Sequence, residues 1–259
     1  MKKSSSSAGV TLIEILIGIV ISVIMMAAMF TSYNAVNNTY SQVIDKAKSS
    51  QTGRDVVGML IKDIRLAGYF HIDDVRKRPT NYAPILITNT NSDCDKIELI
   101  HGDREIKLPI TDPAEYNYET FKITYECKDT TIMNKKTNKK EDVYAIFKSK
   151  SKWDGSKWDY MSDDKTFKEE LIVDYINAIE FIPTDEAGRR IEKINNLNDS
   201  NKIKVIEIKL TIRSKNEFFK KVDDRNVLSL GPRKERWHRD KFLRDAVIAT
   251  AHTRNMGLE

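Results

Sequence analysis

The stretch AGVTLIEILIGIVISVIMMAAMF, Ala8 to Phe30, decides the fold of this chain. From Val10 to Phe30 nearly every residue is apolar, and Glu14 is the single charged residue among them. An α-helix of about 21 residues is about 32 Å long, which matches the hydrocarbon thickness of a bilayer. We therefore expect residues 10–30 to cross a membrane as a helix.

The flanks of this run distinguish an anchor from a discarded signal. A cleavable secretory signal has an apolar region of about 7–15 residues followed by a small-residue cut site. The run here is longer, and no such site follows it, so an uncleaved anchor fits better. Lys2 and Lys3 precede the run, and Asp45 is the first charge after it. Basic residues favour the cytoplasmic side, which predicts a cytoplasmic N-terminus and places the rest of the chain outside.

The helical pattern continues beyond the apolar run. Apolar residues recur at helical steps at Val36, Tyr40, Val43, Ala47, Val57, Leu60, Ile64 and Ala67. Gly53 and Gly58 weaken the middle of this segment, so KSSQTG (48–53) could be a break or a flexible joint. Gly68 is a plausible stop. We predict a lipid-soluble helix over residues 10–30 and an amphipathic helix over residues 31–68.

Glu14 needs a partner or a route to water. An ionised acid near the bilayer centre is costly, but Glu14 is only four residues from Val10 and therefore near one interface. It could reach back to the headgroups. Alternatively, cutting the chain between Gly9 and Val10 would create an α-amino group at a similar depth, and this cation could pair with the carboxylate.

The run Gly9-Val10-Thr11-Leu12-Ile13-Glu14, after a short lysine-bearing leader, resembles the processing site of type IV prepilins and of type II secretion pseudopilins. The resemblance implies that residues 1–9 are a leader and that a prepilin peptidase cuts after Gly9 and methylates Val10. It also implies that Glu14 pairs with the N-terminal amine of a neighbouring subunit during assembly. The family usually has phenylalanine where this chain has Val10.

A looser resemblance covers the rest of the chain. The helix end LIKDIRLAGY (60–69) is similar to that of PilW-type minor pilins, as are LIVDYINAIEF (171–181), VIEIKLTIRS (205–214) and ATAHTRN (249–255). Pseudopilin J of type II secretion shares much of this plan. The resemblance implies a minor pilin in the bacterial inner membrane that primes assembly of a type IV pilus near its tip. Its partners would be other pilins and the assembly platform.

Residues 69–259 contain short runs of alternating character, typical of an antiparallel sheet with one exposed face. These runs are residues 96–102, 105–110, 121–126, 143–148, 178–182 and 205–212. In the last of them, Ile206, Ile208, Leu210 and Ile212 should face the core. Polar residues 130–142 and 195–202 are predicted to be loops. A long N-terminal helix packed on such a sheet gives an α+β, type IV pilin-like fold.

Candidate chemistry in this head is sparse. The net charge of +5 is small and the charges are mixed along the chain, which does not argue for nucleic acid. His71, Asp73 and Asp74 lie in a charged turn, and His101 with Asp103 lacks a nucleophile. Asp163 and Asp164 lack the spacing of a calcium loop. We assign no catalytic residue and expect no cofactor or metal.

Two further features leave alternatives open. Cys94 and Cys127 lie outside the predicted membrane helix, where a disulfide can persist, and adjacent strands could bring them together or leave them free. The doubled Ser-Lys-Trp-Asp contains Trp153 and Trp158 on either side of Gly155. It could form a tight turn with two packed tryptophans, or an exposed tip whose rings stack on a sugar or a base.

Overall fold

The computed structural model describes residues 9–70, 79, 82–89, 94–107, 109, 116–134, 138–160, 164–194, 196–219, 221–227 and 236–256. The chain divides into two compact units, residues 1–45 and residues 46–259. His71, Asp73, Asp74 and Asp163, which the sequence analysis considered and did not assign to a site, lie outside the described residues.

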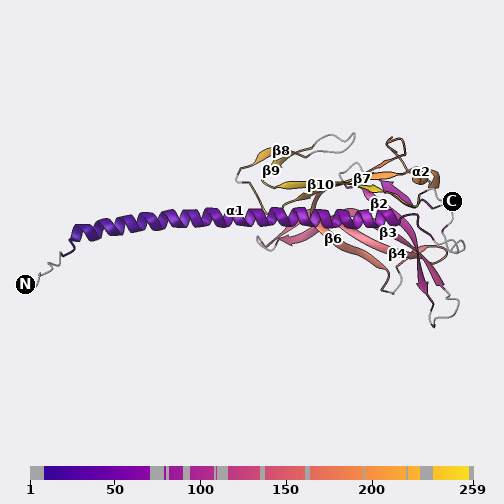
Figure 1. Cartoon of the computed structure of the whole chain (residues 1–259), viewed down its shortest axis with the longest axis horizontal. Helices are drawn as coiled ribbons and strands as arrows, with labels where there is room; N and C mark the ends of the chain where they lie inside the picture. Colours follow the sequence, from indigo (N-terminus) through magenta and orange to yellow (C-terminus); the bar gives the residue numbers. More distant parts are fainter. Residues whose placement is uncertain are drawn as a thin grey trace, which may run out of the picture. The chain divides into compact units, whose positions relative to one another are not determined.

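Helix α1 (Leu12–Leu66) is continuous over 55 residues (Figure 1). The break suggested by KSSQTG (48–53) does not occur. The glycine at position 53 has a different reason, which is the space available there. A Cβ atom on Gly53 would lie 2.8 Å from Cγ2 of Val247 and 3.2 Å from Cδ1 of Ile212. Gly53 is therefore a point of close approach between the helix and the sheet, not a joint.

The part of α1 in the second unit buries one apolar stripe. Val56, Val57, Leu60 and Ile64 are all at most 3% exposed. In the first unit, by contrast, Val36, Tyr40 and Val43 are 60–66% exposed. The head therefore covers the C-terminal members of the predicted stripe, and the amphipathic character of residues 31–45 stays a prediction.

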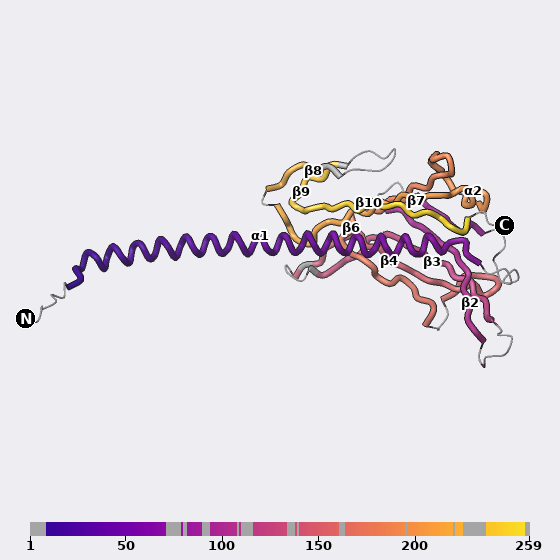
Figure 2. The backbone as a smooth tube through the Cα atoms, in the orientation of Figure 1, coloured from indigo at the N-terminus to yellow at the C-terminus, as the bar shows by residue number. Residues whose placement is uncertain are grey.

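The head is built on an antiparallel sheet in the order β1-β2-β3-β4-β6-β7-β10, with β5 paired to β4 and with β8 and β9 forming a separate pair (Figure 2). The strands are β1 (Ile85–Thr88), β2 (Lys96–Ile106), β3 (Tyr116–Asn134), β4 (Lys139–Trp153), β5 (Trp158–Asp159), β6 (Phe167–Thr184), β7 (Val205–Arg213), β8 (Asp223–Val227), β9 (Arg236–Asp240) and β10 (Arg244–His252). The last strand, β10, pairs with β7 and not with its neighbour in sequence.

The hydrophobic core lies between α1 and the sheet. Leu60 and Ile64 of the helix belong to the same buried cluster as Tyr125, Phe181 and many aliphatic residues of the strands. On β7, Ile206, Ile208, Leu210 and Ile212 are buried as predicted. This arrangement confirms the α+β class, with a long N-terminal helix packed on an antiparallel sheet.

Four details of the sequence-based prediction were wrong. Residues 130–142 are mostly the ends of β3 and β4, where β-branched residues pair across the strands, as in Thr130 with Val143. Residues 195–202 contain the short helix α2 (Leu197–Asn201), because the Asn196 side chain accepts a hydrogen bond from the Asp199 amide. Residues 105–106 continue β2 and do not begin a new strand. Lys209 of β7 is buried and pairs with Glu180 of β6 at 3.7 Å, so this strand is covered on both faces.

Candidate functional site

The N-terminal site is built by the first turn of α1. Thr11 precedes the helix, and Glu14 is its third residue. The Glu14 carboxylate oxygen Oε2 accepts hydrogen bonds from the Thr11 amide and from the Thr11 hydroxyl, both at 2.8 Å. The Glu14 amide lies 3.4 Å from Thr11 Oγ1, which accepts its hydrogen bond. This reciprocal pattern is a capping box, in which the two side chains satisfy amides that the helix leaves unpaired.

The capping box gives Glu14 a local role that the sequence analysis missed. The signal was present, because Thr-x-x-Glu at the start of an apolar run is the sequence pattern of such a cap. The carboxylate is therefore held next to the backbone of Thr11. This position is one residue away from the amine that cutting after Gly9 would create.

The Gly9–Val10 junction lies before the helix and is open. Val10 is 72% exposed, and a Cβ atom added to Gly9 would meet nothing within 4 Å. The chain itself therefore places no steric demand on residue 9.

Hydroxyl groups along the rest of the apolar segment and at its end are hydrogen-bonded within the helix, as an apolar environment requires. These groups donate to carbonyl groups one turn earlier, as Ser22 does to Gly18 at 2.8 Å. Thr31 does the same with Ala27 at 3.0 Å. α1 contains a stretch long and apolar enough to cross a membrane, and none of that stretch is buried within the chain. These features are compatible with an anchor.

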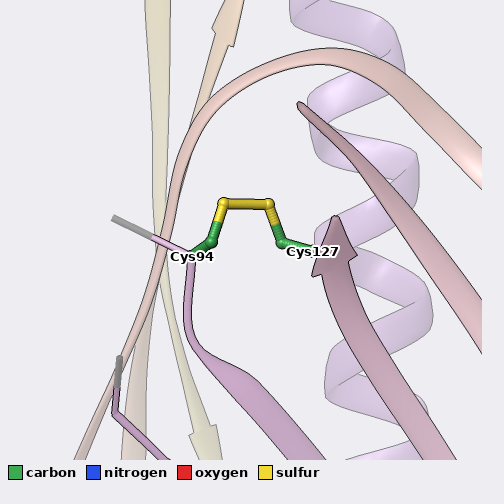
Figure 3. Close-up of a disulfide and its surroundings, with 2 residues drawn as sticks. All are labelled: Cys94 and Cys127. Carbon is green, nitrogen blue, oxygen red and sulfur yellow. A yellow bond between two sulfur atoms is a disulfide. The ribbon is translucent and has the colours of Figure 1, made fainter. Parts of the chain in front are cut away.

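The structure joins Cys94 and Cys127 as a disulfide (Figure 3). Their Cα atoms are 5.3 Å apart. The register of β2 and β3 pairs Ile97 with Tyr125, which brings Cys127 close to the residues just before β2. Cys94 also forms a bridge with Ile179 of β6, so the disulfide connects a segment that contacts two parts of the sheet.

Trp153 and Trp158 form a cross-strand pair between β4 and β5. Their ring centroids are 5.2 Å apart in an edge-to-face arrangement, and the Lys122 ammonium lies 5.1 Å from the centre of the Trp158 ring. The turn between them is closed by Asp154, whose carboxylate accepts from the amides of Ser156 and Lys157. These hydrogen bonds, the one from the Lys157 amide first, lower the pKa of Asp154. The two half-buried rings thus contact each other within a tight turn.

A second site, at the end of α1, was not predicted. Asp63 is buried in the helix, where it accepts a 2.6 Å hydrogen bond from the Tyr125 hydroxyl and pairs with Lys148 Nζ at 2.8 Å. Burial, together with the nearby Asp63 carboxylate, raises the pKa of Tyr125, so its hydroxyl stays protonated and donates. This polar group fixes the helix on β3 and β4.

The C-terminal tail completes the helix end. Asn255 Nδ2 donates to the carbonyl groups of Arg65 at 3.0 Å and Ala67 at 3.5 Å, which the helix leaves unpaired. Gly68 has a φ of +76°, and a Cβ atom there would lie 2.9 Å from the Asn255 carbonyl oxygen. Asn255 therefore contacts the end of α1 both through its side chain and through its backbone carbonyl.

The remaining candidates that the structure describes form no site. His101 of β2 is buried against Phe121 of β3, with ring centroids 6.1 Å apart. Asp103 follows it on the same strand. Within the part of the chain that the structure describes, no group of three or more His, Cys, Asp or Glu side chains could hold a metal ion.

Comparison with known proteins identifies a solved structure with a similar fold. No protein-family profile and no curated protein match the sequence. Among solved structures, the chain is similar to a type IV-like pilin from Thermus thermophilus, with 14% sequence identity and a TM-score of 0.52. The similarity covers 80% of this chain and 96% of that one. Together with the long helix on an antiparallel sheet, it shows that this chain has a type IV pilin-like fold.

Proposed function

We propose that this chain is a minor pilin of PilW type, which primes assembly at or near the tip of a type IV pilus. The observation that carries the proposal is the division of α1. Residues 12–30 are apolar on nearly all sides and uncovered by their own chain, and the last turns, from Val56 to Ile64, are built into the core of a pilin-like head. A pilin needs both, because the first half must sit in lipid before assembly and against other subunits afterwards. We assign it no catalytic residue.

In this proposal, residues 10–30 anchor the chain in the bacterial inner membrane, with the N-terminus in the cytoplasm and the head outside. A prepilin peptidase removes residues 1–9 and methylates Val10. The open Gly9–Val10 junction supports access by such an enzyme. Mass spectrometry of the N-terminus in membrane and sheared-surface fractions tests this. We expect a chain starting at methylated Val10, and Gly9→Leu should keep its leader. Recovery of only the full-length Met1 form from wild-type cells contradicts the proposal.

Glu14 is then the residue that aligns incoming subunits. In the single chain, its carboxylate already binds two donors of Thr11, and an amine of a neighbouring subunit adds a third, charged partner. Loss of the charge should therefore reduce incorporation into filaments, while insertion, cutting and head folding remain intact. A valine is also less costly in lipid than an acid.

Two variants separate this role from capping. Glu14→Gln keeps an oxygen that can accept the capping hydrogen bonds but removes the charge, whereas Glu14→Val removes both. We expect both variants to assemble poorly, as measured by crosslinking to partner pilins and by the amount in sheared filaments. If the glutamine variant assembles like wild type and the valine variant does not, Glu14 serves as a cap and not as an assembly acid.

An alternative is a pseudopilin J-like subunit of type II secretion, which shares the anchor and the processing site. The location of the processed chain distinguishes the two roles. A pilus subunit is recovered in filaments sheared from the cell surface, whereas a pseudopilus subunit remains with the cells.

A further inference from the structure

The main sheet ends in two outer strands, β1 and β10, and their edges differ. An outer strand carries a row of backbone N–H and C=O groups without a neighbouring strand, and soluble proteins usually shorten, charge or cover such a strand. β1 is short, and its Ile85 amide donates to the Oγ of the buried Ser200 at 3.0 Å. The short helix α2, which contains Ser200, therefore satisfies this amide at the edge of β1.

The C-terminal part of β6 forms another edge, because its register with β4 extends only to Ile176. Beyond that residue, the segment before β2 covers the strand. The Asp95 amide donates to the Ile179 carbonyl at 3.0 Å, and the Phe181 amide donates to Asp95 Oδ2 at 3.1 Å. The disulfide at the adjacent Cys94 holds this segment to β3. Specific groups of the chain therefore cover both of these edges.

β10 is nine residues long and pairs with β7 without a shift of register. Two hydrogen bonds fix which of its backbone groups face β7. The Ser214 amide donates to the Leu243 carbonyl at 2.7 Å just before the strand, and the Thr253 amide donates to the Lys204 carbonyl at 3.0 Å just after it. Hydrogen-bonded pairs alternate with non-hydrogen-bonded pairs along this register. The odd-numbered residues of β10 therefore bond β7, and the even-numbered residues direct their N–H and C=O groups away from it.

Ala246, Ile248 and Thr250 thus form a row of donors and acceptors on the outer side of β10. No strand pairs with this side among the residues that the structure describes. The side chains of the three residues are exposed, and Ile248 is 51% exposed. A second extended backbone presents its own donors and acceptors at the same spacing as this row. The chemistry of the edge therefore specifies a strand as its occupant.

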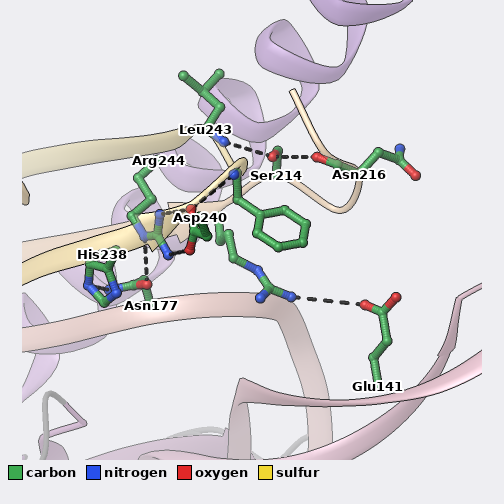
Figure 4. A network of polar contacts seen from close by, with 10 residues as sticks. Glu141, Asn177, Ser214, Asn216, His238, Asp240, Leu243 and Arg244 are labelled. Carbon is green, nitrogen blue, oxygen red and sulfur yellow. Dashed lines mark hydrogen bonds and ion pairs between the residues drawn. The ribbon is translucent and has the colours of Figure 1, made fainter. Parts of the chain in front are cut away.

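The sequence of β10 does not protect this edge. Its charged residues lie at the start of the strand, where the Arg244 guanidinium donates to Asp240 and Asn177 (Figure 4). The Asp245 carboxylate accepts a hydrogen bond from Ser50. Residues 246–251, AVIATA, contain no charge and no proline, and no bulge interrupts them. A long, regular and uncharged edge of this kind is a template for adding another strand.

β10 runs in the same direction as the last turns of α1. Gly53 approaches Val247 in the strand, and Asn255, which follows the strand, binds the carbonyl of Arg65 at the helix end. Two copies paired antiparallel through β10 would be related by a two-fold axis, which reverses α1 in one of them. Subunits anchored in one membrane with their heads on the same side cannot be joined in this way. The occupant is therefore a different subunit.

We propose that the open edge of β10 binds an extended, uncharged segment of a neighbouring pilin subunit, which adds a strand antiparallel to β10. The inference rests on the proposed function for the identity of this partner. Backbone hydrogen bonds to Ala246, Ile248 and Thr250 would hold the added strand. Apolar or β-branched side chains of the partner opposite Ile248 would add favourable cross-strand contacts. A partner segment rich in charge would find no opposite charge along residues 246–251.

The first test measures amide hydrogen exchange in the full chain in neutral detergent. The amides of Ala246, Ile248 and Thr250 should exchange at least about tenfold faster than those of Val247 and Ala249, whose hydrogen bonds to β7 must open first. Mass spectrometry with fragmentation at single residues resolves the alternation. Equal protection of the two sets would show that the edge is already closed, and would overturn the proposal.

The second test is made in cells, with a photo-reactive benzoylphenylalanine in place of Thr250. We expect a crosslink to an extended segment of a different subunit that has the same kind of apolar N-terminal helix. Ile248→Pro removes an outward N–H but no bond to β7, and should reduce the crosslink about tenfold, because an acceptor of the partner loses its donor. Ile248→Ala keeps the backbone and should crosslink like wild type.

Denaturation in detergent checks that the variant heads fold. Ile248→Lys places a charge on the same edge and replaces the proline variant if that variant does not fold. The proposal is overturned if the alanine variant loses the crosslink while the proline or lysine variant keeps it. It is also overturned if position 250 crosslinks only to a second copy, or to no protein while the processed chain is present in membranes or filaments. Absence of the processed chain from both fractions contradicts the proposed function instead.

Discussion

The two halves of α1 are alike as helix and opposite in environment. Leu16 in the first unit is 54% exposed, and Leu60 in the second is fully buried. Nearly every residue from Leu12 to Phe30 is apolar, whereas the second half has one apolar stripe among polar residues. The source of the covering surface also differs. The head supplies it for Leu60, whereas the first half exposes more apolar surface than a soluble monomer leaves open and needs a partner outside the chain.

Two acids of α1, Glu14 near its start and Asp63 near its end, are satisfied in different ways. Glu14 binds donors of Thr11 within its own first turn. Asp63 binds Tyr125 and Lys148, which come from the sheet. Glu14 is therefore satisfied within its own helix, whereas Asp63 depends on the fold of the head. The following predictions test this difference, from the largest expected effect to the smallest.

Truncating one leucine in each half should separate them most clearly. Leu60→Ala leaves a cavity in the core and should lower the free energy of unfolding of the head by about 2–5 kcal/mol. Leu16→Ala removes an exposed side chain and should leave it unchanged. Chemical denaturation in detergent, followed by the fluorescence of the head tryptophans, measures both. Equal losses for the two variants would show that the first half contributes to the stability of the head.

Replacing either of two glycines of α1 should change the free energy of unfolding less than Leu60→Ala does, and in opposite directions. Gly53→Ala places a Cβ atom 2.8 Å from Val247 Cγ2, and the shift this requires should cost about 1–3 kcal/mol. Gly58 has nothing within 4 Å of its Cβ position, so Gly58→Ala should stabilise the helix by about 0.4–1 kcal/mol. The same denaturation experiment measures the two values. A stabilised Gly53→Ala variant would contradict the close approach to β10.

Acid should weaken the head through His101. Burial, with the nearby Lys150 ammonium, lowers the pKa of His101, so the unfolded chain takes up this proton at a higher pH than the folded one. Stability is therefore complete above the unfolded pKa of about 6.5 and falls as the pH decreases below it, by at most about 1.4 kcal/mol per pH unit. His101→Gln should reduce this fall, as seen in denaturation curves from pH 7.5 to 5. The exposed His252→Gln is the control and should retain it.

The sequence predicted the parts of the fold that depend on repeated patterns. Alternation in β7 identified the residues of its core face, because one face of a strand packs on the helix. It could not reveal that Lys209 is also buried, since this depends on a partner, Glu180, that is distant in sequence. The polar residues 130–142 looked like a loop because strands that extend beyond the core expose both faces. Gly53 looked like a break because its contact with Val247 is a tertiary one.

The candidate sites show the same limit. The junction at Gly9 and the acid at Glu14 lie in one short motif and can be recognised from it. The capping box was equally local but was overlooked. Asp63 and Asn255, in contrast, act on groups far away in the chain, so their roles require the structure. The exposure of Trp237 was missed because the sequence pattern does not distinguish an exposed tryptophan from a buried one.

The hydrogen bond from Asn255 to the end of α1 has a consequence for the order of synthesis. The two residues that it joins are separated by 190 positions. A ribosome makes the helix first and Asn255 only after β1 to β10. The last turn of α1 therefore cannot accept this hydrogen bond until all of these strands have been synthesised. Such distant contacts also slow folding, because a long loop must close before they form.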